Sequence, residues 1–196
     1  MYRVVSIRHA IHAKFSSEDA AAKIFLKGAN EKTMEIKHPF NPVFNSESEI
    51  LILGSFPSVK SREQLFFYGH PRNRFWKVLS SVFKAELPET ISEKRAFLLD
   101  HHIALWDVIA SCEITGSSDA SITNVQVNDL SPILCSAKIR AIFANGAKAQ
   151  ELYMKYTYPI TGSLAVKLPS TSPANAAYSY ERLISEWAAQ ISPYIT

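Results

Sequence analysis

The chain has 196 residues, of which 47% are hydrophobic and 20% are charged, and its formal net charge is +3. This make-up is that of a single globular domain with a real core, and the charge is too small to indicate a nucleic-acid coat, so any DNA contact would depend on a local cluster of Lys and Arg. The two cysteines lack metal-ligand spacing, and no apolar run approaches membrane-spanning length, so we expect no metal, no membrane contact and a cytoplasmic protein with reduced thiols.

The first part of the chain differs from the rest. Residues 1–37 form an N-terminal extension of unknown role, with a possible short helix at Ser17–Lys27 that begins at a Ser cap. A stretch with Pro39 and Pro42 leads into the predicted domain, residues 38–196.

Four short apolar runs predict buried strands. Segments with helical character separate them, and Leu183, Ile184, Trp187 and Ile191 mark an amphipathic closing helix. The sequence therefore predicts an α/β fold, a three-layer α/β/α domain with a mostly parallel central sheet of about four strands flanked by helices. The predicted strands are Ile50–Leu53, Ile103–Val108, Ile139–Ala144 and Leu164–Leu168, and the helices are Asn73–Phe83, Ile91–Leu99, Ala147–Tyr156 and Ala177–Ile191.

Ligands of such sheets bind beyond the carboxyl ends of the strands. This rule places Gly54–Ser58, Asp107, Asn145 and Pro169–Asn175 on one rim. We expect Asp107 to support loop backbone, with a role as a base as the alternative. Asn145 is expected to begin a turn without chemistry.

The segment Tyr68–Trp76 combines an aromatic ring, an amide and two guanidinium groups at the start of a predicted helix. A ring can stack on a base, and Arg can bridge phosphates. Phe75 and Trp76 are expected in the core, and Asn73 is either a helix cap or a polar group of the site. The loop Leu168–Ala176, stiffened by two prolines, either contacts phosphates or simply connects a strand to a helix.

Together these loops resemble the uracil-DNA glycosylase superfamily. Gly69–Lys77 is similar to the mismatch-specific uracil and thymine glycosylases, whereas the combination with Gly54–Ser58 and Leu168–Asn175 is most like the hypoxanthine-DNA glycosylases, the sixth family. The likeness runs from about His38 to the C-terminus. It implies a base-excision repair enzyme that hydrolyses the N-glycosidic bond of a deaminated base in double-stranded DNA, with hypoxanthine as the first candidate.

The resemblance also implies residue roles. Phe56 stands where the uracil-specific families have the Asp or Asn that positions water, so Asn73 becomes the leading catalytic candidate, as a residue that orients water or holds the base. Ser172 stands where a His supports the departing base in the uracil glycosylases, and it is the second catalytic candidate.

Further residues are candidates for binding. Tyr68 would be the stacking platform, with Ser55, Phe56 and Asn175 also against the substrate. No lysine occupies an obvious nucleophile position, so we expect a monofunctional glycosylase. We also expect a monomer that needs no cofactor. The candidate DNA contacts are Ser58, Lys60, Arg72, Arg74, Ser170 and Thr171.

Two alternatives remain open. The protein is a mismatch-specific uracil/thymine-DNA glycosylase, against which Phe56 argues, or it is a non-catalytic protein that binds damaged DNA. The absence of a Gly-x-Ser-x-Gly elbow and of a phosphate-binding loop leaves a small-molecule hydrolase without support.

Overall fold

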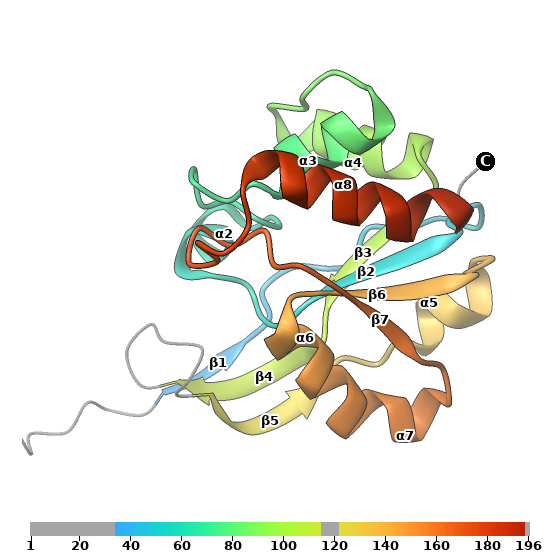
Figure 1. Cartoon of the computed structure of the whole chain (residues 1–196). Coiled ribbons are helices and arrows are strands. Elements are labelled where there is room, and N and C mark those ends of the chain that lie inside the picture. The colour runs from blue at the N-terminus through green and yellow to red at the C-terminus, as the bar shows by residue number, and fades with distance from the viewer. Residues whose placement is uncertain (1–33, 115–121, 195–196) are drawn as a thin grey trace, which may run out of the picture. The chain divides into compact units, whose positions relative to one another are not determined.

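The computed structural model describes residues 34–114 and 122–194 (Figure 1). One compact unit spans Glu35–Thr196. The predicted helix Ser17–Lys27 and most of the predicted extension 1–37 lie outside the described residues, so the boundary at residue 38 stays a prediction.

Strands and helices are interspersed along the described chain. In order they are β1 (Met34–Lys37), β2 (Ile50–Gly54), α2 (Val59–Gln64), α3 (Phe75–Phe83), α4 (Ile91–Asp100), β3 (Ile103–Asp107), β4 (Ile109–Ile114), β5 (Thr123–Val127), α5 (Ser131–Ser136), β6 (Ala141–Asn145), α6 (Ala147–Leu152), a π-helical turn (Tyr153–Thr157), α7 (Tyr158–Thr161), β7 (Ala165–Leu168), α8 (Tyr180–Ile191) and a 3-10 turn (Ser192–Tyr194). None of the helices in the described ranges is long and apolar enough to cross a bilayer.

The central sheet has four parallel strands in the order β3-β2-β6-β7. In the middle strand, Leu51 pairs with Ala104 of β3 on one side and with Ile142 of β6 on the other. These strands are the four that the apolar runs predict. The prediction of a mostly parallel α/β sheet is therefore confirmed.

Both faces of this sheet are buried, which explains why its strands are apolar without a break. Ile50 and Ile52 of β2 belong to one core cluster, and Leu51 and Leu53 belong to a second. Successive side chains of a strand point to opposite faces, so a strand buried on both sides needs apolar residues at every position. The sheet is thus the middle layer between two cores.

Helices α3, α4 and α8 cover one face of the sheet (Figure 1). Phe75 and Trp76 of α3 are buried as predicted, and so are Leu183 and Trp187 of α8. The opposite face is covered by α5, α6 and the turns that follow α6 (Figure 1). The two helical layers match the predicted three-layer arrangement.

A second sheet, with strand order β1-β4-β5, lies on the same face as α6 (Figure 1) and was not predicted. Strands β4 and β5 are antiparallel, and β4 begins two residues after β3 ends, separated only by Val108. The predicted strand Ile103–Val108 covers β3 and the connecting Val108, and it leaves β4 unpredicted. Asn128 holds the corner, since its side-chain amide donates to the carbonyls of Asp107 and Ile109 at 2.9 and 3.1 Å.

Candidate active site

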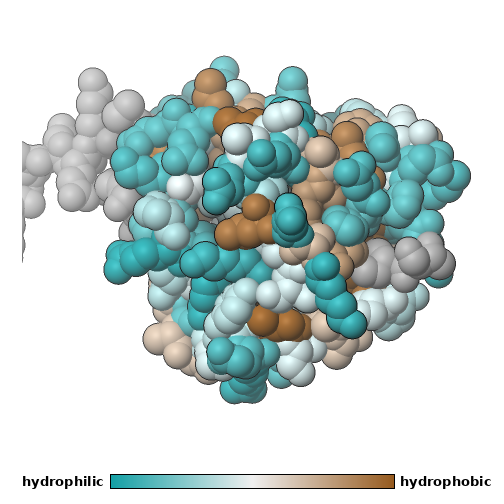
Figure 2. Space-filling model, turned by 90° about the horizontal axis from the view of Figure 1, so that it is seen from above, coloured by the Kyte–Doolittle hydropathy of each residue, from teal (hydrophilic) through white to brown (hydrophobic). Residues whose placement is uncertain are grey.

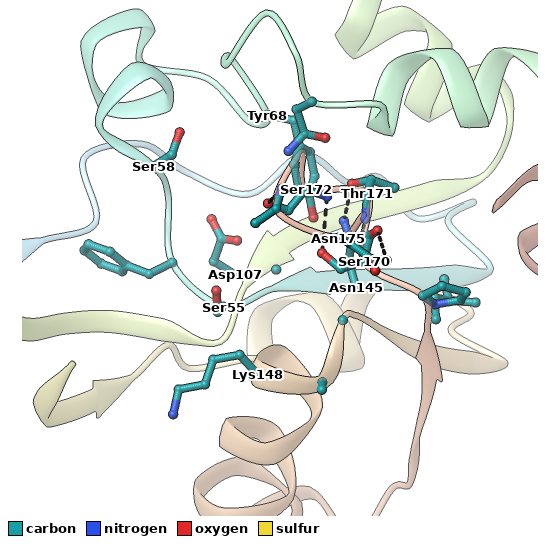
Figure 3. A pocket seen from close by; sticks show the side chains of 18 of the residues that line it. Ser55, Ser58, Tyr68, Asp107, Asn145, Lys148, Ser170, Thr171, Ser172 and Asn175 are labelled. Carbon is teal, nitrogen blue, oxygen red and sulfur yellow. Dashed lines mark hydrogen bonds between the residues drawn. The ribbon is translucent and has the colours of Figure 1, made fainter. Parts of the chain in front are cut away.

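A cavity of about 560 Å³ lies at the carboxyl ends of the parallel strands (Figure 3). A pocket of this size suits a small organic ligand. The four strands end here because they are parallel, and each contributes its last residue or the residues that follow it. The predicted rim lies in one place, since Gly54–Ser58, Asp107 and Asn145 line the cavity together with every residue of Pro169–Asn175 except Pro173.

The first loop follows β2, and two backbone hydrogen bonds fix its start. The carbonyls of Gly54 and Ser55 accept the backbone N–H groups of Val108 and Ile109 at 2.9 and 3.1 Å. Phe56 is 8% exposed, and its ring makes an edge contact with His38. Phe56 therefore shapes the wall and has no side-chain polar group with which to hold a water molecule.

Residue 54 must be glycine because the Asp107 carboxylate approaches its backbone closely. A Cβ at this position would collide with Oδ1 of Asp107 and lie 3.2 Å from the Tyr68 hydroxyl. The strand end, the carboxylate and the phenol thus meet at one point of the cavity. Any side chain on residue 54 would displace the carboxylate.

We expect Gly54→Ala to lower the free energy of unfolding by about 1–3 kcal/mol, because it overpacks a buried contact. Asp107→Ala removes the colliding group, so in that background Gly54→Ala should cost at least about 1 kcal/mol less. Urea denaturation of the two single variants and the double variant measures this coupling. Additive effects of the two substitutions would contradict the predicted contact.

Tyr68 lies in a left-handed backbone conformation, with φ of 54°, and its ring stacks on Phe75 with centroids 3.8 Å apart. One ring face is therefore covered by α3. The hydroxyl is buried near the Asn145 side chain, without a well-aligned hydrogen bond to the described residues. Burial, followed by the charge of Asp107, raises the pKa of Tyr68, so the phenol stays protonated at neutral pH.

Asn73 lines the cavity just before α3. Its Oδ1 accepts the backbone N–H of Phe75 at 3.0 Å, and its own N–H donates to the carbonyl of His70 at 2.8 Å. These bonds fix the amide at the start of the helix. Arg74 is the N-cap residue of α3, so Asn73 precedes the cap and supports the start of the helix through the N–H of Phe75, while its Nδ2 has no partner among the described residues.

Arg74 joins the first part of the site to the last loop. Its guanidinium donates to the carbonyls of Ser172, Asn175 and Tyr178 at 3.0, 2.9 and 2.6 Å. The backbone N–H of Arg74 also donates to the carbonyl of Thr171 at 3.1 Å. The sequence predicts that Arg74 contacts a DNA phosphate. In the structure, these hydrogen bonds instead hold the loop that follows β7.

Asn145, expected to be only a turn residue, also holds the loop that follows β7. Its Nδ2 donates to Oγ1 of Thr171 at 2.9 Å, and its Oδ1 accepts the N–H of Thr171 at 3.0 Å (Figure 3). Thr171 is fully buried, so its side chain is not presented to a duplex in this conformation. Its geometry favours a positioning role over the expected DNA contact.

The rest of the last loop is held by its own polar groups. Asn175 donates from Nδ2 to the carbonyl of Ser170 at 2.8 Å, and Oγ of Ser170 accepts the N–H of Ser172 at 3.2 Å. Oγ of Ser172 accepts the N–H of Ala174 at 3.3 Å. Ser170, Ser172 and Asn175 all line the cavity, as the predicted site requires.

The remaining candidate DNA contacts lie near the surface. Ser58 caps α2 and lines the cavity, whereas Lys60 is exposed and pairs with Glu63 at 2.7 Å. Arg72 is exposed next to the site but does not line the cavity. Lys148, which the sequence pattern did not single out, lines the cavity from the start of α6 and lies 3.3 Å from Glu151 (Figure 3).

Asp107 is the strongest feature that sequence reasoning undervalued. It is 4% exposed, and its Oδ2 lies 2.9 Å from Nε2 of His38, whose side chain is 3% exposed. His38 and Asp107 are 69 residues apart, so no local pattern links them. Within the described ranges, no group of three His, Cys, Asp or Glu side chains is placed to hold a metal ion.

Comparison with known proteins agrees with this geometry. The model of the family described as "Uracil DNA glycosylase superfamily" matches residues 42–191. A curated protein of Methanosarcina acetivorans named hypoxanthine DNA glycosylase is 36% identical over 159 residues, which is 79% of this chain and 97% of the relative. A protein of Methanosarcina barkeri with the same name is 34% identical over 117 residues, covering 59% of this chain and 74% of that relative.

A solved structure has the same fold. The solution NMR structure of a Methanosarcina acetivorans protein provisionally described as a uracil DNA glycosylase matches with a TM-score of 0.70 and 34% identity, covering 82% of this chain and 99% of the other. The family model, the relatives and the fold agree. The chain belongs to the uracil DNA glycosylase superfamily.

Proposed function

We propose that this protein is a monofunctional DNA glycosylase that hydrolyses the N-glycosidic bond of a deaminated base, with hypoxanthine as its principal substrate. The observation that carries the proposal is a cavity at the strand ends where Phe56 replaces a water-positioning side chain and Asn73 supplies an amide. The relatives named hypoxanthine DNA glycosylase support the same choice of substrate.

The reaction begins when the damaged nucleotide leaves the base stack and enters the cavity, a step that costs a few kcal/mol and is easiest at a mismatched pair. Cleavage of the bond then places positive charge on the sugar and negative charge on the base. Donors fixed in advance near the departing base lower this barrier. Hydrogen bonds hold the loops around the cavity in place, so the polar groups of these loops are fixed before the base enters.

Asn73 takes the central role in this proposal. Its Oδ1 already accepts the N–H of Phe75 at 3.0 Å, and its Nδ2 donor, which has no partner among the described residues, is the group we assign to the reaction. A donor stabilises charge on the leaving base or holds the oxygen of the attacking water. It does not remove the proton from that water, so Asn73 positions and stabilises rather than acting as a general base.

The DNA-binding surface is part of the same proposal. Arg72, Lys60 and Ser58 lie beside the first two loops, and Lys148 extends the set on the other side of the cavity. Such groups hold a duplex through its phosphates without reading sequence. We further propose that the protein acts as a monomer on double-stranded DNA in the cytoplasm, without a metal or cofactor.

A panel of duplexes, each with one hypoxanthine, xanthine, uracil or mispaired thymine, separates the proposal from its alternatives. We expect the fastest base release from the deoxyinosine duplex. Fastest release of mispaired uracil or thymine would indicate the mismatch-specific activity that the segment Gly69–Lys77 suggests. Tight binding to lesion duplexes without any base release would indicate a damaged-DNA binding protein.

A further inference from the structure

A second hollow lies between α3 and the first turn of α8. It is a groove of about 490 Å³, and its lining includes Lys77, Ser81, Lys84, Leu87 and Tyr180. None of these residues lines the cavity at the strand ends. The groove is therefore a surface of its own, outside the site described above.

The groove begins next to the cavity. Asn73 and Tyr178 line the cavity, and α3 and α8 each begin two residues after one of them. Arg74 joins the two walls at this point, since its guanidinium donates to the carbonyl of Tyr178 at 2.6 Å. A DNA strand that leaves the cavity across Arg74 therefore meets the groove next.

Two lysines give the groove its positive charge. Lys77 and Lys84 are seven residues apart along α3 and its C-cap, so they lie on the same side, about 10 Å apart along the helix axis. Both are exposed, and neither makes an ion pair with the described residues. The acidic residues Glu86 and Glu181 neighbour lining residues in sequence, but neither lines the groove. The two ammonium groups are thus available to an anionic ligand.

Hydrogen bonds fix the walls of the groove. The Tyr180 hydroxyl donates to the carbonyl of Lys77 at 2.9 Å and lies 2.9 Å from Oγ of Ser81. These bonds tie the first turn of α8 to α3. A groove that is formed in advance loses less conformational entropy when a ligand binds.

The surface around the groove suits a nucleic acid better than an apolar partner. Figure 2 shows the face that carries α3, α4 and α8 as largely hydrophilic, with small and separate hydrophobic areas. The centres of protein–protein interfaces are poor in charged residues, and Lys is depleted there. Contacts to a DNA backbone, in contrast, depend on Lys and Arg.

We propose that this groove binds the phosphate backbone of the DNA that flanks the damaged base on one side, with Lys77 and Lys84 each facing a phosphate. This inference rests on the proposed glycosylase function and adds a contact surface outside the cavity. Only one flank is contacted, because the groove leaves the cavity at one edge. The contact strengthens binding without changing the reaction, since neither lysine lines the cavity.

Two duplexes test the contact, one with deoxyinosine near its left end and one with deoxyinosine near its right end, so that each has a long flank on one side. The double variant Lys77→Gln/Lys84→Gln should bind one of them roughly ten- to a hundred-fold more weakly than wild type at low salt. The slope of log affinity against log salt should become shallower by about 2, the effect of two lost phosphate contacts. The other duplex should bind as it does to wild type, which also shows that the variant is folded. Equal weakening of both duplexes, or of neither, would overturn the inference.

Base release from the saturated complex separates this inference from the proposed function. We expect the double variant to release hypoxanthine at the wild-type rate under single-turnover conditions with saturating protein. Slower release at saturation would place the lysines in the reaction and reject the backbone contact. No base release by the wild-type protein would reject the proposed function, whereas the difference between the two duplexes in binding would still stand or fall on its own.

Lys155→Gln is the matched control, because Lys155 is exposed on the turn after α6 and lines neither the cavity nor the groove. It should leave the affinity for both duplexes unchanged. Titration with inorganic phosphate distinguishes DNA from a free anion. If the double variant lost phosphate binding but bound both duplexes like wild type, the groove would be a site for a free anion and the inference would be overturned.

Discussion

Asn73→Asp should reduce the rate of hypoxanthine release by roughly a hundred- to a thousand-fold, the usual effect of removing one donor aimed at developing charge. The substitution is chosen because a carboxylate oxygen can still accept the N–H of Phe75, which Asn73 bonds at 3.0 Å. The hydrogen bond at the start of α3 is kept, and a negatively charged acceptor oxygen takes the place of the Nδ2 donor. Single-turnover kinetics on a deoxyinosine duplex measures the effect.

Asn73→Ala removes both the acceptor for the N–H of Phe75 and the Nδ2 donor, and it separates the two roles. We expect it to lose activity as Asn73→Asp does, and in addition to lower the free energy of unfolding by about 1 kcal/mol. If Asn73→Asp were fully active and only Asn73→Ala impaired, Asn73 would stabilise the start of α3 without a part in the reaction.

Arg74→Met should have the second large effect, on the shape of the last loop. The guanidinium donates to three carbonyls, those of Ser172, Asn175 and Tyr178. A hydrogen bond to a charged donor contributes about 1.5–3 kcal/mol, and because the side chain is half-buried we expect a total loss of about 3 kcal/mol. Hypoxanthine release should fall as well, since the loop carries Ser172 and Asn175 against the cavity.

Arg72→Ala is the control for charge, because Arg72 is exposed two residues away. We expect its stability to stay within about 0.5 kcal/mol of wild type, with duplex binding weakened in a salt-dependent way. Thermal unfolding and binding at several salt concentrations compare the two variants. A destabilised Arg72→Ala, or an Arg74→Met protein as stable as wild type, would contradict the assigned roles.

The central sheet could be predicted because its strands are buried on both faces. Ile50–Gly54 and Ala141–Asn145 are apolar at nearly every position, which a strand with one exposed face would not be. Once the strands are known to be parallel, the loops at their carboxyl ends must meet. The same rule therefore located the cavity and its rim.

The second sheet could not be predicted from the same signal. Thr123–Val127 has exposed or half-buried residues throughout, and Ile109–Ile114 follows β3 with one residue between them. A polar edge strand lacks the apolar run that marks the central strands, and a corner without Gly or Pro gives no break in the pattern.

Residue types located the site more reliably than they assigned roles within it. Arg74 and Thr171 stand in loops that suit DNA contact, but the direction of a side chain depends on partners far along the chain. Arg74 reaches carbonyls about 100 residues away, and His38 reaches Asp107 across 69 residues. The sequence shows such groups without showing that they meet.

The most direct measurement of the central claim is the detection of free hypoxanthine released from a duplex with one deoxyinosine. We predict that the wild-type protein releases the base and leaves an abasic site, without strand cleavage, and that Asn73→Asp does so at least about a hundred-fold more slowly. Binding to this duplex without release of the base, or release that is unaffected by Asn73→Asp, would contradict the account.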